Sequence, residues 1–282
     1  MLNAINYKQT FKKELAKVYT DGELDILFKM LMADLKKHAF NSVLTAQVEL
    51  NSAEEHFFNH AVNELKALKP IQHVLGKADF YGLHFTVSPH VLIPRPETEE
   101  LVELIISENK NKVIDILDIG TGSGCIAITL KNQLPDANVS ALDISLDAIA
   151  IAKQNAFANQ ATISFFSDDA LNLLPTNYPK YDVIVSNPPY IAEKEKAEME
   201  YLVTKNEPHV ALFVKDNEPL IFYDKIADFA LKSLKCGGTL YFEINQNFAK
   251  ETKDLIESKG FTVDLIKDLN NNFRMIKARI LG

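Results

Sequence analysis

The stretch IDILDIGTGSG, residues 114–124, decides the fold of this chain. Its apolar first half is typical of a buried strand, and the apolar residues after it begin a helix. Between them lie Gly120, Gly122 and Gly124. Glycine permits a sharp turn and lets the backbone approach a ligand closely. The GxGxG spacing differs from the GxGxxG of dinucleotide-binding folds, so the loop favours a nucleoside or amino-acid ligand over a pyrophosphate.

Strands and helices alternate after this point. We expect strands at 113–118, 138–142, 162–166, 181–186, 239–244, 261–266 and 273–280, and helices at 125–133, 146–157, 219–234 and 248–258. Strands that are apolar almost throughout, joined by helices, indicate an α/β fold with a doubly wound, mostly parallel sheet of seven strands. In such sheets ligands bind at the carboxyl ends of the strands.

The first 70 residues read as a small helical bundle. Asp21 can cap one helix, and Ser52 with Glu55 has the pattern of a capping box for another. Residues 71–95 are rich in β-formers and predict a β-hairpin connector. Proline at 96, followed by acidic residues, is typical of a helix start, so a third part covers 96–282.

Composition argues against several classes of protein. The chain has 282 residues, a net charge of -8 and a pI near 5.4, which argues against phosphate-driven binding of nucleic acid and fits a basic partner. Cys125 and Cys236 lie too far apart in sequence for a metal site or a disulfide framework. With no signal core and no long apolar run, we expect no membrane span and a cytoplasmic location.

Acidic residues follow three successive strands. Asp143, about 20 residues past the loop, is placed to accept hydrogen bonds from ribose hydroxyls, although Asp143 or Ser145 could instead cap the next helix. Asp118, in the first strand, could neutralise an ammonium group at the other end of the same ligand. Asp168 could accept from an adenine amine and the Asp169 backbone could frame the ring, unless both only form a turn.

The strand at 181–186 runs into Asn187-Pro188-Pro189-Tyr190. Proline fixes φ and donates no backbone hydrogen bond, so this is a rigid turn that offers acceptors. The Asn187 side-chain oxygen and the Pro188 carbonyl suit the two N–H groups of a planar amide or amine, and Tyr190 supplies a stacking face. The alternative, a turn without a ligand, is disfavoured by its position at the end of a buried strand.

These motifs resemble those of the protein N5-glutamine methyltransferases, and most of all the branch that acts on peptide chain release factors. The resemblance spans most of the chain. Its residues are 72–76, 80–82, 92–99, 120–124, 187–191, Glu207-Pro208, 211–213, Glu243-Ile244 and Gln246. Asp169 replaces an aromatic residue of some relatives, and Asn245 replaces the usual glycine.

The resemblance implies a class I methyltransferase domain at 96–282, joined by the hairpin to a helical domain at 1–70 that recognises the protein substrate. It implies that Gly120, Thr121, Gly122, Ser123, Gly124, Asp143, Asp168, Asp169 and Asn187 bind S-adenosylmethionine. Asn187, Pro188, Pro189 and Tyr190 would hold the substrate glutamine, with Asn187, Pro188 and Tyr190 as the catalytic groups. The implied reaction methylates the glutamine in the Gly-Gly-Gln motif of class-1 release factors. We expect the enzyme to be a monomer and to use no metal.

Three rival interpretations stay open. Glutamine methylation of a ribosomal large-subunit protein needs the same chemistry. N6-adenine DNA methylation also uses an Asn-Pro-Pro-Tyr turn, but it requires a basic surface and a target-reading domain. A binding or scaffold protein without activity would not need the whole set of cofactor residues.

Overall fold

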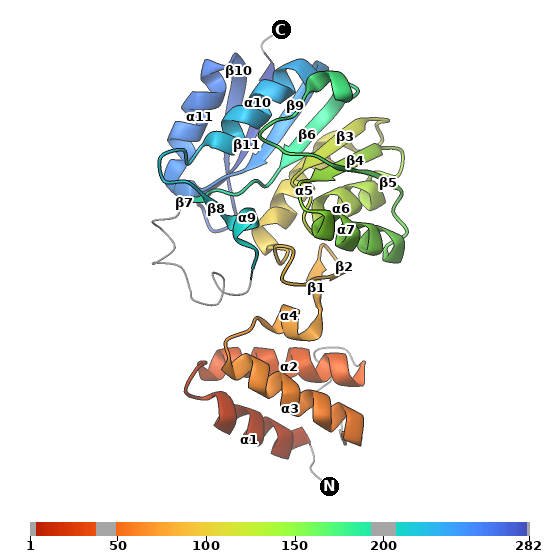
Figure 1. Cartoon of the computed structure of the whole chain (residues 1–282), viewed down its shortest axis with the longest axis vertical. Helices are drawn as coiled ribbons and strands as arrows, with labels where there is room; N and C mark the ends of the chain where they lie inside the picture. The colour runs from red at the N-terminus through yellow and green to blue at the C-terminus, as the bar shows by residue number, and fades with distance from the viewer. Residues whose placement is uncertain (1–3, 38–48, 193–206, 281–282) are drawn as a thin grey trace. The chain divides into compact units, whose positions relative to one another are not determined.

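The computed structural model describes residues 4–37, 49–192 and 207–280. These residues pack into two compact units, one that runs to Lys77 and one that begins at Ala78 (Figure 1).

The first unit is helical. It contains α1 (Ala4–Leu15), α2 (Asp21–Lys36), α3 (Ser52–Lys66) and the short α4 (Ile71–Leu75). Its core contains aromatic pairs. The ring centroids of Phe11 and Phe28 lie 5.5 Å apart and those of Tyr7 and Phe58 5.2 Å apart, and both pairs meet edge to face. This geometry lets the positive edge of one ring meet the negative face of the other.

The helix caps differ from those expected. Thr20 caps α2 in a capping box with Glu23, so Asp21 is the first helical residue. Asn51 does the same for α3 with Glu54, so Ser52 is inside the helix. Thr20 and Asn51 have extended backbones that aim a side-chain oxygen at the third amide of the helix, which is what capping requires. The helices themselves were expected.

Residues 71–75 were expected to belong to the hairpin, and this is wrong. They form α4, which starts after Pro70 and ends at Gly76, whose φ of 69° is left-handed. Only the residues beyond form strands, β1 (Lys77–Phe80) and β2 (Leu83–Thr86). Tyr81 and Gly82 join them with φ of 50° and 73°, as a two-residue hairpin turn requires.

The second unit is built on a seven-stranded sheet of order β10-β11-β9-β6-β3-β4-β5. Its strands are β3 (Asp115–Ile119), β4 (Asn138–Asp143), β5 (Ile163–Ser167), β6 (Tyr181–Ser186), β9 (Leu234–Glu243), β10 (Phe261–Lys267) and β11 (Phe273–Ile280). Strands β5, β4, β3, β6 and β9 are parallel, and β11 pairs antiparallel with β9 and β10. The mostly parallel, doubly wound sheet is therefore confirmed.

Helices cover both faces of this sheet (Figure 1). They are α5 (Pro96–Asn109), α6 (Cys125–Gln133), α7 (Leu146–Ala158), α10 (Ile221–Ser233) and α11 (Ala249–Ser258). Leu101 of α5 and Leu130 of α6 belong to one apolar core, and Ile226 of α10 and Ile256 of α11 belong to another. Because side chains alternate along a strand, Ile116 and Leu117 of β3 each enter a different core.

Several short elements complete the unit. They are η1 (Pro175–Asn177), β7 (Ile191–Ala192), α9 (His209–Leu212), β8 (Phe213–Val214) and η3 (Gln246–Phe248), and β7 pairs parallel with β8.

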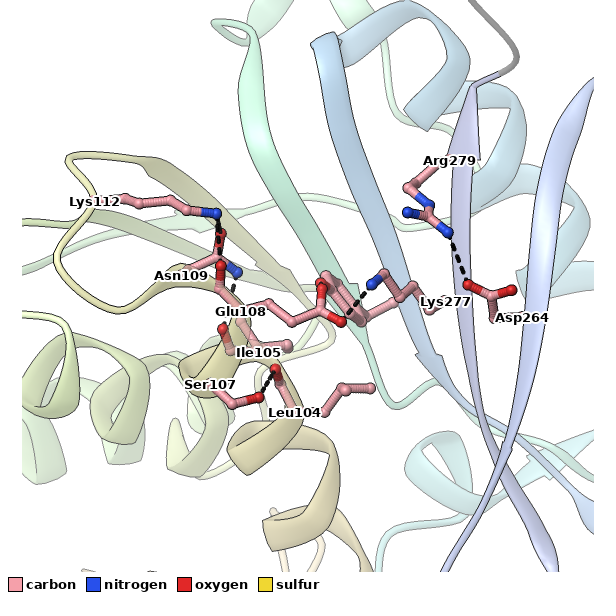
Figure 2. A network of polar contacts seen from close by, with 10 residues as sticks. Leu104, Ile105, Ser107, Glu108, Asn109, Lys112, Asp264, Lys277 and Arg279 are labelled. Carbon is pink, nitrogen blue, oxygen red and sulfur yellow. Dashed lines mark hydrogen bonds and ion pairs between the residues drawn. The ribbon is translucent and has the colours of Figure 1, made fainter.

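The end of α5 is tied to the sheet by the polar network in Figure 2. Glu108 accepts hydrogen bonds from Lys277 of β11 and, at 2.6 Å, from the hydroxyl of Tyr241 of β9. Lys112 donates to the Glu108 carbonyl at 2.6 Å, which satisfies an acceptor left free at the helix end. These contacts fix α5, which begins at Pro96, against β9 and β11 of the sheet.

Candidate functional site

A cavity of about 240 Å³ lies at the carboxyl ends of β3, β4, β5 and β6. Both strong sequence motifs meet there. The described residues that line it include 119–123, Asp143, 168–171 and 186–189. Further residues of its wall come from the segment before α5, including Arg95, and from α5 itself through Thr98.

The glycine loop has the conformation that its sequence predicts. Gly120, Gly122 and Gly124 have φ of 76°, 54° and 84°, values that favour glycine. The amides of Gly120 and Thr121 both donate to the Leu142 carbonyl at 2.9 Å, which joins the loop to β4. Of these glycines, only Gly124 is closely packed: a Cβ there would lie 2.8 Å from Ile128 Cδ1 and 3.2 Å from Ala152 Cβ, so neighbouring side chains would have to shift. Gly120 and Gly122 have open space instead, so a ligand can approach their backbone.

Asp118 lies beneath the loop, and its carboxyl is not among the groups that line the cavity. Thr121 Oγ1 donates to Asp118 Oδ2 at 2.6 Å, while the buried Oδ1 has no hydrogen-bond partner among the described residues. Burial raises the pKa of Asp118 to about 7. A positive charge bound on the loop above Asp118 would stabilise the ionised form of this carboxyl.

Asp143 lines the cavity at the end of β4. Its Oδ2 accepts from the Gly122 amide at 2.9 Å and its Oδ1 from the Ser145 amide at 2.9 Å. Burial raises its pKa, and these backbone donors oppose that shift. Ser145, not Asp143, caps α7 by accepting from the Ala148 amide. Because each carboxylate oxygen can accept two hydrogen bonds, Asp143 keeps the capacity to accept from a further donor.

Asp168 and Asp169 both line the cavity, with different side-chain contacts. Asp168 accepts from the Tyr178 hydroxyl at 2.6 Å, and burial together with this carboxylate raises the pKa of Tyr178. Asp169 accepts from the amide of Leu171 and the side chain of Asn172, so its carboxylate holds a turn. The turn interpretation thus describes the Asp169 side chain, and the adenine contacts remain predictions.

Asn187, Pro188 and Pro189 line the cavity where β6 ends. Tyr190 is not among the described residues of the cavity wall. Its hydroxyl donates to Glu243 Oε1 at 3.2 Å, and its carbonyl accepts from Asn245 Nδ2 at 3.1 Å. These contacts hold the ring against the core, so a stacking role for Tyr190 stays a prediction.

Sequence reasoning gave no role to Glu243 or Thr98, which lie beside this turn. The Glu243 side chain is buried, and its Oε2 accepts from Thr98 Oγ1 at 2.6 Å. Thr98 Oγ1 accepts in turn from Asn187 Nδ2 at 3.3 Å. A signal for Glu243 existed, because it ends an apolar strand as Asp143 does.

An ion pair braces the wall of the cavity. Arg95 Nη2 lies 2.5 Å from Glu207 Oε1, and Glu207 Oε2 accepts from the Ile93 amide at 3.1 Å. Only 1% of the Glu207 side chain is exposed, so its charge needs these partners. The pair joins the segment before α5 to the chain that follows residue 206.

None of the described helices is long and apolar enough to span a membrane. The described His, Cys, Asp and Glu residues include no group of three arranged to hold a metal ion.

Comparison with known proteins places this chain among methyltransferases. The family model of the methyltransferase small domain matches residues 97–210, which hold the glycine loop and the Asn187 turn. Among solved structures, a methyltransferase from Pyrococcus furiosus superposes with a TM-score of 0.52 at 17% identity, covering 82% of this chain and all of that one. This likeness supports the class I methyltransferase fold.

Curated relatives are similar over nearly the whole chain. The release factor glutamine methyltransferase of Flavobacterium psychrophilum is 44% identical, over 97% of this chain and 98% of its own length. That of Bacteroides thetaiotaomicron is 41% identical over 95% and 96%, and that of Staphylococcus aureus 36% over 98% and 99%. These identities over nearly the full length of both chains, together with the matched methyltransferase domain, show that the chain is an S-adenosylmethionine-dependent methyltransferase and belongs to the release factor glutamine methyltransferase family.

Proposed function

We propose that this enzyme methylates the side-chain amide nitrogen of the glutamine in the Gly-Gly-Gln motif of class-1 peptide chain release factors. One observation carries the proposal. Asn187 stands in the cavity wall at the end of β6, and its Nδ2 is directed to Thr98. Its Oδ1 is then the atom left to accept a hydrogen bond from a substrate amide.

The cavity suits S-adenosylmethionine, which supplies an electrophilic methyl group on its sulfonium sulfur when bound. The open backbone at Gly120 and Gly122 allows close approach, and the unpaired Asp118 Oδ1 beneath the loop favours a cationic ligand above it. We assign the loop residues 120–124 to the amino-acid part, Asp143 to the ribose hydroxyls, and Asp168 with the Asp169 backbone to the adenine. Asn187 would contact both the cofactor and the substrate.

An amide nitrogen is a poor nucleophile, because its lone pair is delocalised into the carbonyl. If Asn187 Oδ1 and the Pro188 carbonyl accept its two N–H groups, the nitrogen is fixed in position and gains electron density. Such orientation supplies a large part of the acceleration in displacement reactions. Pro188 and Pro189 keep these acceptors rigid, and Tyr190 would confine the amide plane. The surplus proton then leaves to water.

We further propose that the helical residues 1–70 recognise the release factor, that 71–95 connect, and that 96–282 carry the chemistry. The described residues of the cavity wall all belong to the second unit, so the first is free for recognition. The net charge of -8 supports an enzyme that binds a basic protein and makes no direct contact with nucleic acid. We place it in the cytoplasm, as a monomer.

The test is mass analysis of a release factor after incubation with the enzyme and labelled S-adenosylmethionine. One added methyl group on the Gly-Gly-Gln glutamine supports the proposal, and a release factor with that glutamine replaced by alanine is the control. Parallel reactions with ribosomal large-subunit proteins and with DNA test the rivals. Labelling of either of these instead of the release factor would overturn the proposed substrate.

A further inference from the structure

The carboxylate of Glu243 is buried next to the candidate site without lining it. Only 1% of the residue is exposed, and its carboxylate is not in the cavity wall. Burial raises its pKa, which the hydrogen bond from Thr98, the charge of Arg274 and the hydrogen bond from Tyr190 oppose. Burying a carboxylate is costly, so a buried one at the edge of an active site calls for a role.

The hydrogen bonds around Glu243 have one consistent set of directions. An ionised carboxylate only accepts, so at 2.6 Å the single hydroxyl proton of Thr98 is directed to Glu243 Oε2. Thr98 Oγ1 can then only accept from Asn187, at 3.3 Å, and the group that donates is the Nδ2 amide nitrogen. The side-chain oxygen of Asn187, Oδ1, therefore lies on the side of the amide that faces away from Thr98.

We propose that Glu243, acting through the Thr98 hydroxyl, is a positioning residue that fixes the side-chain amide of Asn187 with its oxygen toward the substrate. An amide turned by 180° would present an NH2 group to the NH2 group of a glutamine, two donors that cannot pair. The relay excludes that orientation. The inference rests on the proposed function, since it assumes that the substrate offers an amide N–H to Asn187.

The second oxygen of Glu243 serves the same turn. Oε1 accepts from the Tyr190 hydroxyl at 3.2 Å, so one carboxylate holds the residues at both ends of Asn187–Tyr190. The main chain of Glu243 is held as well, because the Tyr223 hydroxyl donates to its carbonyl at 3.3 Å. A carboxyl group whose two oxygens both accept can therefore set two side chains at once.

The test compares Thr98→Val, which removes the hydroxyl at nearly constant shape, with Thr98→Ser, which keeps it. Thr252→Val is the matched control, because Thr252 is also buried and its hydroxyl donates to a carbonyl, that of Phe248, but in α11. For each protein we would measure kcat and KM for release-factor methylation, the Kd for S-adenosylmethionine by calorimetry, and the melting temperature.

We expect Thr98→Val to lower kcat on the order of ten- to a hundredfold, as small losses of alignment do, and to change the Kd for the cofactor much less than kcat. Thr98→Ser should restore most of kcat, and Thr252→Val should leave it unchanged. Glu243→Leu should resemble Thr98→Val, because it removes the acceptor that directs the hydroxyl proton of Thr98 away from Asn187.

The relay would be overturned by normal kcat in Thr98→Val, by equal losses in the valine and serine variants, or by normal kcat in Glu243→Leu. A loss of cofactor affinity in Thr98→Val equal to its loss of kcat would also contradict it. Failure of the proposed function is distinct, because the unaltered enzyme would then leave the release factor unmethylated in the same assay.

Discussion

The side-chain amide of Asn155 pairs with the backbone of Thr86 through two hydrogen bonds, as one strand pairs with another. The Thr86 amide donates to Asn155 Oδ1 at 2.7 Å, and Asn155 Nδ2 donates back to the Thr86 carbonyl at 3.0 Å. The same Nδ2 donates to the carbonyl of Ser123 in the glycine loop at 2.9 Å. One fully buried amide in α7 thus joins the hairpin to the loop that we assign to the cofactor.

Asn155→Asp is expected to destabilise the second unit strongly. A carboxylate in this position would face two carbonyl oxygens in place of a donor, and each lost buried hydrogen bond costs on the order of 1–3 kcal/mol. Asn159→Asp is the control, since Asn159 Nδ2 also donates to a carbonyl of the hairpin, that of His84, from a half-buried position. Urea unfolding should show a clearly larger loss for Asn155→Asp, and equal losses would refute a special role for this link.

Asp143→Ala should weaken the binding of S-adenosylmethionine. Each hydrogen bond from a ribose hydroxyl to this carboxylate is worth roughly 1.5–3 kcal/mol, so the Kd should rise about tenfold or more. Exposed Asp136, before the same strand, is the matched control as Asp136→Ala. Titration calorimetry decides the matter, and an unchanged Kd would remove Asp143 from the cofactor site.

Much of the fold was predictable because its signals are local. The buried strand and the glycines after it specify their own conformation, so the strand expected at 113–118 is observed at Asp115–Ile119, and the loop and the helix after it were also expected. The helix expected at 219–234 is observed at Ile221–Ser233. The short α4 was missed because β-branched Ile71 and Val74 favour a strand, whereas Pro70 and the left-handed Gly76 delimit a single helical turn.

The site was predictable in part, for the same reason. Asp143 and Asn187 follow strands whose ends must meet, so their approach could be inferred from topology alone. The bond between Thr98 and Glu243 joins residues 145 positions apart, and that between Thr86 and Asn155 joins residues 69 apart. Such pairs depend on tertiary packing, and no periodicity in the chain reports them.

Asn187→Ala should reduce turnover far more than it reduces stability. The lost oxygen orients the nucleophile, while the lost contact to Thr98 is a single hydrogen bond at 3.3 Å. Methylation rates and thermal melts should be recorded on the same preparation. If the variant melts early and its folded fraction methylates at the normal rate, Asn187 has only a structural role.

Asp118 should make stability depend on pH. Its pKa is raised to about 7 in the folded chain against 3.8 for a free aspartate, mainly by burial. The folded state therefore binds the proton more tightly, so the stabilisation is full below pH 4 and is lost as the pH rises through 7. Asp118→Asn cannot titrate. Between pH 5 and 8 the unaltered enzyme should lose stability relative to this variant, and parallel urea curves would contradict the shift.

The first unit should serve substrate recognition and not chemistry. The described residues of the cavity wall begin at His90, so a chain that starts at Gly76 keeps all of them together with the whole hairpin. A single glutamine side chain offers far less contact area than a specific protein interface requires, so recognition needs a further surface.

We expect the shortened chain to bind S-adenosylmethionine with a Kd close to that of the full chain. On intact release factor it should lose most of its kcat/KM, chiefly through a higher KM. Calorimetry and methylation assays on the same preparation measure both, and a normal melting transition controls for folding. Full methylation with an unchanged KM would show that residues 1–75 only stabilise the enzyme, and a parallel loss of cofactor binding would show that they help to build the site.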